Sequence, residues 1–422
     1  MRSCCKNRHI VKIKKLMKLI IYFLILFIGI FIGYENPELI DKPKKYFKFN
    51  FTHLDIGNEA QKNINIDTDK KENIYSANSF KVKLEKIIDF DSYSASAFAS
   101  YDENKNLIFK IFTQDGFIID KSNKKKLKLP FTFYDNEEKN GGVKSVFSIK
   151  NYDFALISEK KFNCYYASII NLTNLKKIIE TDCLPDVENI NFAGLGGAYV
   201  KFEDKLLISL GTPTHYSDII NNLSLNNNVF GKIIELKQEE VIKDSYIINT
   251  FDIFTSGHRN PQGIVVQDEE IYSLEHGPQG GDEFNQIIKG NNYGWPIVSL
   301  GTRYGNGNSY KRSHSESGFK EPLFVFLPSI APSSINICPS NIKEYYKNYN
   351  CFIGLSLKEM SIFIFLLKGN RVISLEKIFI NKRLRHFSID KNSATIFFDK
   401  DYNFFVTADN DGLYKVNFFD LR

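Results

Sequence analysis

The sequence lacks the short motifs that mark the commonest cofactor and metal sites. It contains no Walker phosphate-binding loop, no Rossmann glycine fingerprint and no Cys/His spacing of the zinc-binding type. Nucleotide-binding and zinc-binding folds of those kinds are therefore not expected. Helical periodicity is also scarce after the N-terminus, where residues 341–347 predict a single helix of one or two turns.

Acidic residues are absent from the first 18 positions, which hold seven Lys and Arg residues. The whole chain has 55 Lys and Arg against 49 Asp and Glu, so removing those seven leaves 48 against 49, a net charge near −1. The basic pI therefore comes from the N-terminus. The rest of the chain lacks the basic character of a protein that binds nucleic acid, and no nucleic-acid partner is expected.

An apolar run at residues 19–34 follows these cations and is interrupted only by two glycines. Sixteen helical residues span about 24 Å, and extending the helix back to residue 16 brings it close to the thickness of a bilayer core. No small-x-small cleavage motif follows. We expect a basic cytoplasmic leader at residues 1–15 and a transmembrane anchor at residues 16–34 in the inner membrane, with the remainder in the periplasm or outside. A cleaved signal segment is the second choice.

Four of the six cysteines lie in the part expected to be exported, and they form two local pairs. Cys164 and Cys183 flank a predicted hairpin whose turn lies midway between them. Cys338 and Cys351 flank a loop between two β-type runs. Because disulfides form in oxidising compartments, we predict the bonds Cys164–Cys183 and Cys338–Cys351. Four buried free thiols are the alternative.

Residues 35–78 are polar, rich in Lys and Asn, and without sustained periodicity, so they predict a linker. Residues 79–422 carry short β-type runs separated by Asp-, Asn-, Gly- and Lys-rich turns, as in all-β domains. The clearest runs are residues 106–112, 146–149, 154–157, 205–210, 232–236, 246–251, 352–357, 394–398, 403–407 and 413–417. No clean internal repeat is visible, and two β-sandwiches would give the same local pattern as a β-propeller.

The most informative stretch is residues 258–296. It contains three polar loops, HRNPQG at 258–263, EHGPQGGDE at 275–283 and NYGWP at 292–296, separated by β-type runs. Polar residues at strand ends are placed where a rigid sheet presents them to a ligand. Turn carbonyls beside carboxylates also suit calcium. The stretch therefore predicts a binding or catalytic site.

The spacing of the three loops closely resembles that of the soluble glucose, sorbosone and aldose sugar dehydrogenases, which use pyrroloquinoline quinone (PQQ). The likeness is dense over residues 257–301, looser toward the C-terminus and hardly traceable before residue 191. It implies an all-β fold, a six-bladed β-propeller over residues 79–422 that follows the transmembrane helix. It also implies a membrane-tethered oxidoreductase that transfers hydride from C1 of a sugar or alditol to the quinone. The sequence does not identify the sugar or the electron acceptor.

The resemblance assigns cofactor-binding residues by position. Arg259 and Asn260 match a pair that contacts the cofactor, and Lys358 matches a cofactor-binding Lys that follows a β run. Arg383 and Arg385 match an Arg-x-Arg pair that holds PQQ carboxylates, a task to which planar guanidinium groups are suited.

The resemblance also implies calcium. The backbone carbonyls of Gly277 and Pro278 match ligands of the cofactor's calcium, which acts as a Lewis acid on the quinone. Glu283 and Tyr293 match ligands of a second, structural calcium. The two motif histidines, His258 and His276, are expected to make structural hydrogen bonds.

The sequence departs from the family at the catalytic base. The family's His falls at Gly194 in the segment 193–198, and glycine cannot accept a proton. His215 is the nearest imidazole and the only candidate replacement in that region. The alternative function is a catalytically degenerate propeller that binds PQQ, a sugar or a protein. A third reading, a calcium-dependent propeller hydrolase such as a lactonase, is weakened because its axial cluster of carboxylates and Asn is not recognisable.

Overall fold

The structure is a computed structural model that describes residues 73–120, 123–127, 140–161, 164–185, 191–213, 218–243, 252–391 and 393–420. The chain divides into two units, Met1–Lys70 and Lys71–Arg422, and the described residues belong to the second. The expected leader at residues 1–15 and anchor at residues 16–34 lie outside the described residues. Within the described ranges, no helix is both long enough and apolar enough to cross a membrane.

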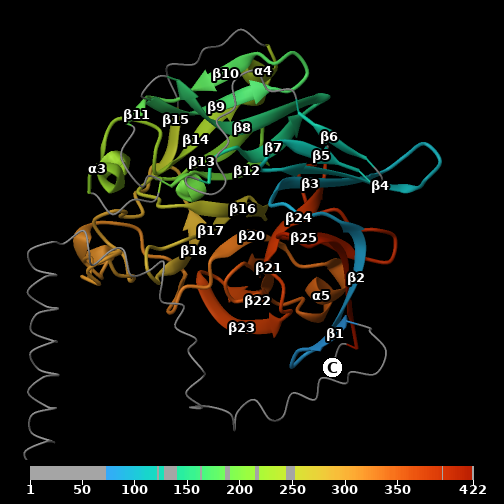
Figure 1. Cartoon of the computed structure of the whole chain (residues 1–422). Helices are drawn as coiled ribbons and strands as arrows, with labels where there is room; N and C mark the ends of the chain where they lie inside the picture. The colour runs from blue at the N-terminus through green and yellow to red at the C-terminus, as the bar shows by residue number, and fades with distance from the viewer. Residues whose placement is uncertain are drawn as a thin grey trace, which may run out of the picture. The chain divides into compact units, whose positions relative to one another are not determined.

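Antiparallel strands make up most of the described chain (Figure 1). A five-stranded sheet contains β7 (Val143–Ile149), β8 (Tyr152–Lys161), β9 (Cys164–Asn171), β10 (Lys177–Glu180) and β11 (Leu184–Pro185). Three four-stranded sheets follow it along the chain. The first contains β12 (Gly196–Phe202), β13 (Lys205–Leu210), β14 (Lys232–Lys237) and β15 (Asp252–Ser256). The second contains β16 (Pro261–Gln267), β17 (Glu270–Glu275), β18 (Asp282–Ile287) and β19 (Phe324–Phe326). The third contains β20 (Pro332–Ile337), β21 (Asn350–Ser356), β22 (Ser361–Lys368) and β23 (Arg371–Phe379).

A nine-stranded sheet joins the two ends of the described chain, in the order β1-β2-β26-β25-β24-β3-β4-β5-β6. Its strands are β1 (Asn73–Ser76), β2 (Lys81–Asp89), β3 (Ser94–Tyr101), β4 (Leu107–Thr113), β5 (Phe117–Ile119), β6 (Lys124–Lys126), β24 (Leu384–Asp390), β25 (Phe404–Ala408) and β26 (Gly412–Phe419). β24 pairs with β3 in parallel, whereas β2 pairs with β26 and β3 with β4 in antiparallel fashion. The parallel pairing divides the sheet into two antiparallel groups, so the described strands form six groups.

The innermost strands of the six groups form a closed circuit. Each of β3, β7, β12, β16, β20 and β24 contacts the next in this order, and β24 pairs back to β3. Figure 1 shows these strands gathered around the middle of the sheet assembly. Loops at one end of the innermost strands therefore meet, although they lie far apart in the sequence.

Six buried apolar clusters fill the spaces between successive groups of strands. One example packs Phe284 of β18 against Phe352 of β21 and Phe365 of β22, with ring centroids 5.7 and 4.9 Å apart. Large aromatic side chains bury more area than aliphatic ones. The 37 phenylalanines of the chain are thus a source of the packing that holds one sheet on the next.

Both predicted disulfides are present. Cys164 and Cys183 are bonded with Cα atoms 5.3 Å apart, and Cys338 and Cys351 are bonded with Cα atoms 5.4 Å apart. The first links the start of β9 to the residue before β11, which itself pairs with β9. The alternative of four free thiols is therefore wrong.

Helical elements in the described ranges are short: η2 (Phe192–Gly194), α3 (Asp218–Asn221), η3 (Asn222–Leu225), α4 (Gln238–Ile242), η4 (Ser315–Ser317) and α5 (Ser340–Tyr345). The helix predicted at residues 341–347 is confirmed as α5. The strand predicted at residues 394–398 is wrong, because Ala394 takes a left-handed conformation (φ 58°) and Ile396 makes only an isolated bridge with Ile389. The strand predicted at residues 246–251 lies outside the described residues.

The first strand lies earlier than the sequence indicates. β1 falls within residues 35–78, which the sequence assigns to the linker, and it pairs with β2 from Asn73 opposite Leu84 to Ser76 opposite Lys81. The folded unit therefore includes the last part of that segment.

Candidate functional site

The motif at residues 258–263 is fixed by a buried hydrogen-bond network. The ring of His258, which is fully buried, bonds Thr255 Oγ1 through Nε2 and Glu275 Oε1 through Nδ1, each at 2.9 Å. The backbone N–H of Arg259 donates to the second oxygen of Glu275 at 3.0 Å. Burial alone would raise the pKa of Glu275, but His258 and these donors hold that pKa below its usual value. His258 therefore has the structural role that was expected.

Asp282 joins the loop at residues 275–283 to the loop that precedes β20. Its carboxylate is fully buried and accepts from Gly277 N at 2.9 Å through Oδ1. Its Oδ2 accepts from Ser329 Oγ, Ile330 N and Ala331 N at 2.7 to 2.8 Å. A buried carboxylate with four donors holds both loops in one conformation. The position of Gly277 at the site depends on it.

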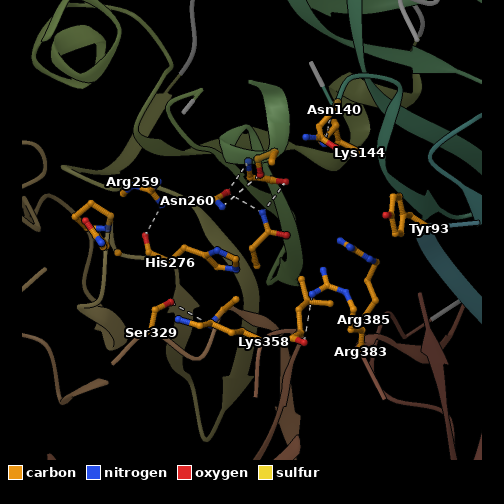
Figure 2. Close-up of a pocket in the computed structure, with 18 of the residues that line it drawn as sticks. Tyr93, Asn140, Lys144, Arg259, Asn260, His276, Ser329, Lys358, Arg383 and Arg385 are labelled. Carbon is orange, nitrogen blue, oxygen red and sulfur yellow. Dashed lines mark hydrogen bonds between the residues drawn. The ribbon is translucent and has the colours of Figure 1, made fainter. Parts of the chain in front are cut away.

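A cavity of about 490 Å³ opens where these loops meet (Figure 2). Its lining includes all five predicted cofactor-binding residues and two of the predicted calcium ligands. The lining residues are Tyr93, Gln114, Asn140, Lys144, Ala193, Gly196, Arg259, Asn260, Gln262, His276, Gly277, Pro278, Gln279, Gly280, Tyr304, Ser329, Ala331, Leu357, Lys358, Arg383, Arg385 and His386. Among these described residues five are Lys or Arg and none is Asp or Glu. The cavity is therefore suited to a ligand with several negative charges.

Arg259 is held between aromatic rings at one side of the cavity. Its guanidinium carbon lies 5.6 Å from the ring centre of Trp295 and 5.8 Å from that of Tyr304, within the range of cation–π contacts. It donates to the carbonyl of His276 at 3.2 Å. Only 7% of the residue is exposed. Its orientation is therefore fixed before any ligand binds.

Asn260 connects the motif to the segment at residues 193–197. Its Oδ1 accepts from Gly196 N at 3.1 Å and from Gln262 Nε2 at 2.7 Å, and its Nδ2 donates to the carbonyl of Ala193 at 3.4 Å. The side chain is 3% exposed. It positions the segment as well as lining the cavity.

The two arginines of the Arg-x-Arg pair share one carboxylate. Arg385 makes a two-point ion pair with the buried Asp409, and the Nη2–Oδ2 distance is 2.6 Å. Arg383 lies at the edge of ion-pair distance, with Nε 3.5 Å from the same carboxylate, and remains half exposed. The guanidinium carbon of Arg385 also lies 5.2 Å from the ring centre of Tyr93. Figure 2 shows both arginines and Lys358 on the same side of the cavity.

Gly194, the predicted counterpart of the family's base, is buried in η2 and does not line the cavity. Its neighbours Ala193 and Gly196 do. Its carbonyl packs so closely on Gly211 that a Cβ atom added to Gly211 would lie 2.2 Å from that oxygen. The alternative candidate, His215, lies outside the described residues.

Two histidines line the cavity, and burial favours the neutral form of both. His276 donates through Nε2 to the carbonyl of Pro332 at 2.6 Å, and burial together with Arg259 lowers its pKa. Burial and then Arg385 lower the pKa of His386 to about 3. The bond of His276 to a carbonyl fits the structural role expected for it.

The predicted calcium ligands lie together around a second, small cavity. Gly277, Pro278, Glu283 and Tyr293 all line a space of about 10 Å³, which holds about one water-sized particle. The carbonyl of Pro278 accepts from the hydroxyl of Tyr304 at 2.8 Å. The hydroxyl of Tyr293 accepts from Ile288 N at 2.9 Å. No group of three or more His, Cys, Asp or Glu side chains arranged to hold a metal ion occurs in the described part of the chain.

The sequence did not identify four lining residues that lie on or beside β3, β4 and β7. Tyr93, Gln114, Asn140 and Lys144 precede residue 191, where the family motifs are hardly traceable. They carry no local pattern, since a single polar residue at the end of a strand has no distinctive spacing. Their membership of the site follows from the closed circuit of strands alone.

Comparison with known proteins gives the family. The sequence model described as Glucose / Sorbosone dehydrogenase matches residues 171–404. The chain belongs to this family. The match includes the segment 193–198, the three motif loops and the pair Arg383 and Arg385.

Named relatives match this chain over part of its length. Aldose sugar dehydrogenase YliI of Escherichia coli is 30% identical over 164 residues, which are 37% of this chain and 43% of that protein. The chain spans less than half the length of the curated relatives it matches first.

Solved structures of the family show the same all-β fold. The apo form of the soluble aldose sugar dehydrogenase of Escherichia coli superposes with a TM-score of 0.60 at 20% identity, covering 80% of this chain and 99% of that one. The PQQ-bound aldose sugar dehydrogenase of Streptomyces coelicolor gives 0.51 at 17% identity, covering 80% and 98%. At these identities the likeness concerns the fold.

Proposed function

We propose that this protein is a PQQ-dependent dehydrogenase of aldoses or related alditols. The observation that carries the proposal is the charge of the cavity: five cationic side chains and no carboxylate among the described lining residues. PQQ is a flat quinone with several carboxylates, so it complements such a cavity in shape and charge. Membership of the family and the PQQ-bound structural relative from Streptomyces coelicolor support the same cofactor.

The cationic residues predicted to bind the cofactor have distinct parts in this proposal. When bound, PQQ supplies the quinone that accepts a hydride from C1 of the sugar. Arg259 provides a rigid guanidinium held by Trp295 and Tyr304, which suits a carboxylate or a quinone oxygen. Lys358 and the Arg383–Arg385 pair provide cations on the other side. Asp409 holds Arg385 in place without fully cancelling the charge of the two arginines.

We include calcium in the proposal because carbonyl and carboxylate oxygens are the ligands that calcium prefers. Gly277 and Pro278, whose carbonyls are the predicted ligands, line both the large and the small cavity. Glu283 adds a carboxylate to the small cavity, and burial raises the pKa of that carboxyl when no cation is near. A bound cation would reverse that shift.

We further propose that the six antiparallel groups are six propeller blades, with β2 completing the group formed by β24, β25 and β26. The anchor at residues 16–34 and a periplasmic location for the rest also remain proposals. The two disulfides support an oxidising compartment.

The second candidate function is a degenerate propeller that binds PQQ or a sugar without turnover. The observation that favours it is Gly194, which is buried and has no side chain to act as a base. The lactonase reading gains no support, because no cluster of three or more acidic, His or Cys side chains is found in the described part of the chain.

Titration of the purified protein with PQQ in the presence of calcium tests the proposal. We expect cofactor absorbance to saturate at one equivalent and aldose-dependent reduction of a dye to follow. Arg259→Met should weaken binding by roughly ten- to more than hundredfold, the loss of about 1.5–3 kcal/mol for a charged hydrogen bond. Arg303→Met is the matched control, because Arg303 also lies over an aromatic ring, 4.6 Å from the centre of Tyr310, but does not line the cavity.

Three outcomes separate the candidates. Saturable binding with turnover supports the dehydrogenase. Stoichiometric binding without dye reduction supports the degenerate propeller. No binding of PQQ, or equal losses in Arg259→Met and Arg303→Met, contradicts the cofactor assignment.

A further inference from the structure

A buried lysine lies in the cavity at a place that no family motif assigns. Lys144 belongs to β7, is 8% exposed and lines the cavity with Asn140 and Tyr93. Its Nζ donates to the carbonyl of Asn140 at 3.1 Å. Figure 2 places Lys144 across the cavity from Lys358. Lys144 is therefore part of the cavity wall, on the side opposite Lys358.

Lys144 adjoins the segment that should carry the missing base. A Cβ atom built on Gly197 would lie 3.5 Å from Cβ and 3.5 Å from the carbonyl oxygen of Lys144. β7 therefore runs directly beside the segment at residues 193–197. A side chain on β7 reaches the cavity from the same side as one on that segment.

The groups around Lys144 favour the uncharged amine. Arg385 and His386 of β24 line the cavity, as does Arg383 just before that strand. Tyr93 lines it from the segment before β3, and Lys358, Arg259 and His276 lie in its other walls. Asp409 pairs with Arg385, and none of the described lining residues is a carboxylate. Burial, and then repulsion by Arg385, lowers the pKa of Lys144 to about 7. An amine with that pKa is half uncharged at neutral pH.

Lys232 shows what a buried structural lysine looks like in this fold. Burial lowers its pKa to about 8, but its Nζ donates to three carbonyls, those of Ser224, Asn226 and Phe230, at 3.0 to 3.2 Å. It does not line the cavity. Lys144 differs because it lines the open cavity and because, among the described residues, its Nζ donates to one carbonyl, that of Asn140.

We propose that Nζ of Lys144 is the proton acceptor for sugar oxidation, in place of the imidazole that Gly194 lacks. This inference rests on the proposed function. As the C1–H bond breaks, the hydrogen and its electron pair pass as hydride to the quinone, which is reduced. The C1 hydroxyl proton passes to the uncharged amine, which becomes an ammonium, and C1 is left double-bonded to oxygen. The ammonium then releases its proton to solvent through the mouth of the cavity.

The pH dependence follows from these charges. The carboxylates of bound PQQ offset Arg385, so they raise the pKa of Lys144 from its value in the free protein. Turnover per bound cofactor should therefore increase with pH, with a midpoint between about 7 and the ordinary lysine value of about 10.4. A histidine base would give a midpoint nearer to about 6.5.

The first test needs no cofactor. In protein labelled with ¹³C at lysine Cε, the resonance absent from Lys144→Met belongs to Lys144, and its pH titration gives the pKa directly. We expect a midpoint near pH 7 for Lys144, against about 10.4 for a lysine in an unstructured peptide. A midpoint above pH 9 for Lys144 overturns the assignment.

The second test separates proton transfer from binding. Lys144→Met should bind PQQ within about tenfold of wild type and lose about 10²- to 10⁴-fold in kcat, the usual contribution of a general base. Lys144→Arg keeps the positive charge, but its guanidinium stays protonated and cannot accept a proton, so it should lose as much kcat as Lys144→Met. Lys144→His should recover part of the rate with a profile shifted to lower pH. Lys201→Met, a partly buried lysine of β12 outside the cavity, is the matched control and should behave as wild type.

The outcomes are distinguishable. Wild type that fails to bind PQQ refutes the proposed function, and with it the role of Lys144, before any variant is compared. Wild type that binds PQQ without oxidising aldoses refutes the dehydrogenase and the role of Lys144 together. Lys144→Met that retains kcat within about threefold, in a wild type that does oxidise aldoses, refutes the role of Lys144 alone. If Lys144→Met does not fold, as judged by its thermal melt, Lys144→Arg is compared with Lys144→His. A higher kcat in Lys144→His supports the role of Lys144, and equal kcat values in the two variants refute it.

Discussion

The replacement Asp282→Asn tests whether the site is held together by one buried carboxylate. Asn keeps the shape of the side chain but replaces one oxygen with an NH₂ group. If the remaining oxygen stays with Ser329, Ile330 and Ala331, the NH₂ faces the N–H of Gly277, which lay 2.9 Å from Oδ1. Two donors then oppose each other in a fully buried place.

The expected cost follows from this geometry. One charged hydrogen bond, worth about 1.5–3 kcal/mol, is lost. The buried N–H of Gly277 also loses its partner, which costs about 1–3 kcal/mol more. The free energy of unfolding should therefore fall by about 2.5–6 kcal/mol. Reversing the amide moves the conflict to Oδ2, where three donors are present, and so gives no relief.

Urea denaturation under non-reducing conditions measures the change. Trp295 is the only tryptophan of the chain and lies beside Arg259, so its fluorescence reports on the site while circular dichroism reports on the sheets. Asp89→Asn is the control: its side chain is 84% exposed and pairs with Lys86, so its loss should cost less than about 1 kcal/mol. If Asp282→Asn is within about 1 kcal/mol of wild type, the carboxylate does not organise the two loops.

Three further predictions concern export, the disulfides and the cofactor clamp. A reporter fused after Arg422 should be active only outside the cytoplasm, and activity inside would refute the expected topology. Replacing Cys164 and Cys183 together by Ser should cost roughly 3 kcal/mol of stability for a loop of this length, measured by denaturation; an unchanged midpoint would show that the bond constrains little. Arg385→Met should weaken PQQ binding by roughly ten- to more than hundredfold in an absorbance titration. The exposed Arg371→Met should have no effect, and equal losses in both would contradict a specific clamp.

The sequence predicted strands well where apolar runs are bounded by turn residues. The runs at residues 205–210 and 232–236 correspond to β13 and β14 almost to the residue. The run at residues 394–398 failed because its two phenylalanines and isoleucine serve to fill the core rather than to pair: Phe397 and Ile396 are buried beside β24 and β25. Apolar composition alone does not distinguish a strand from a buried irregular segment.

The site was predictable where several residues act at fixed spacing. Arg259 and Asn260 belong to a motif whose neighbours, His258 and Glu275, form its supporting network, so the pattern records both function and support. Lys144 belongs to no motif of this kind. Its burial and its neighbour Arg385 come from strands about 240 positions apart in the sequence, brought together by the closed circuit of β3, β7 and β24.

One structural feature explains both the absence of a base at Gly194 and the position of Lys144 on the neighbouring strand. Gly196 and Gly197 take positive φ angles of 79° and 107°, which side chains rarely adopt, and a Cβ on Gly196 would lie 2.8 Å from Gly211 N. The backbone of this segment is thus packed closely on the strand beside it. An imidazole inserted at Gly194 must fit beside that packed backbone, whereas a long flexible amine reaches the cavity from β7 without disturbing it. Because Gly194 does not line the cavity, we expect Gly194→His combined with Lys144→Met to leave kcat for aldose-dependent dye reduction as low as in Lys144→Met alone. Recovery of turnover in the double variant would refute this reasoning.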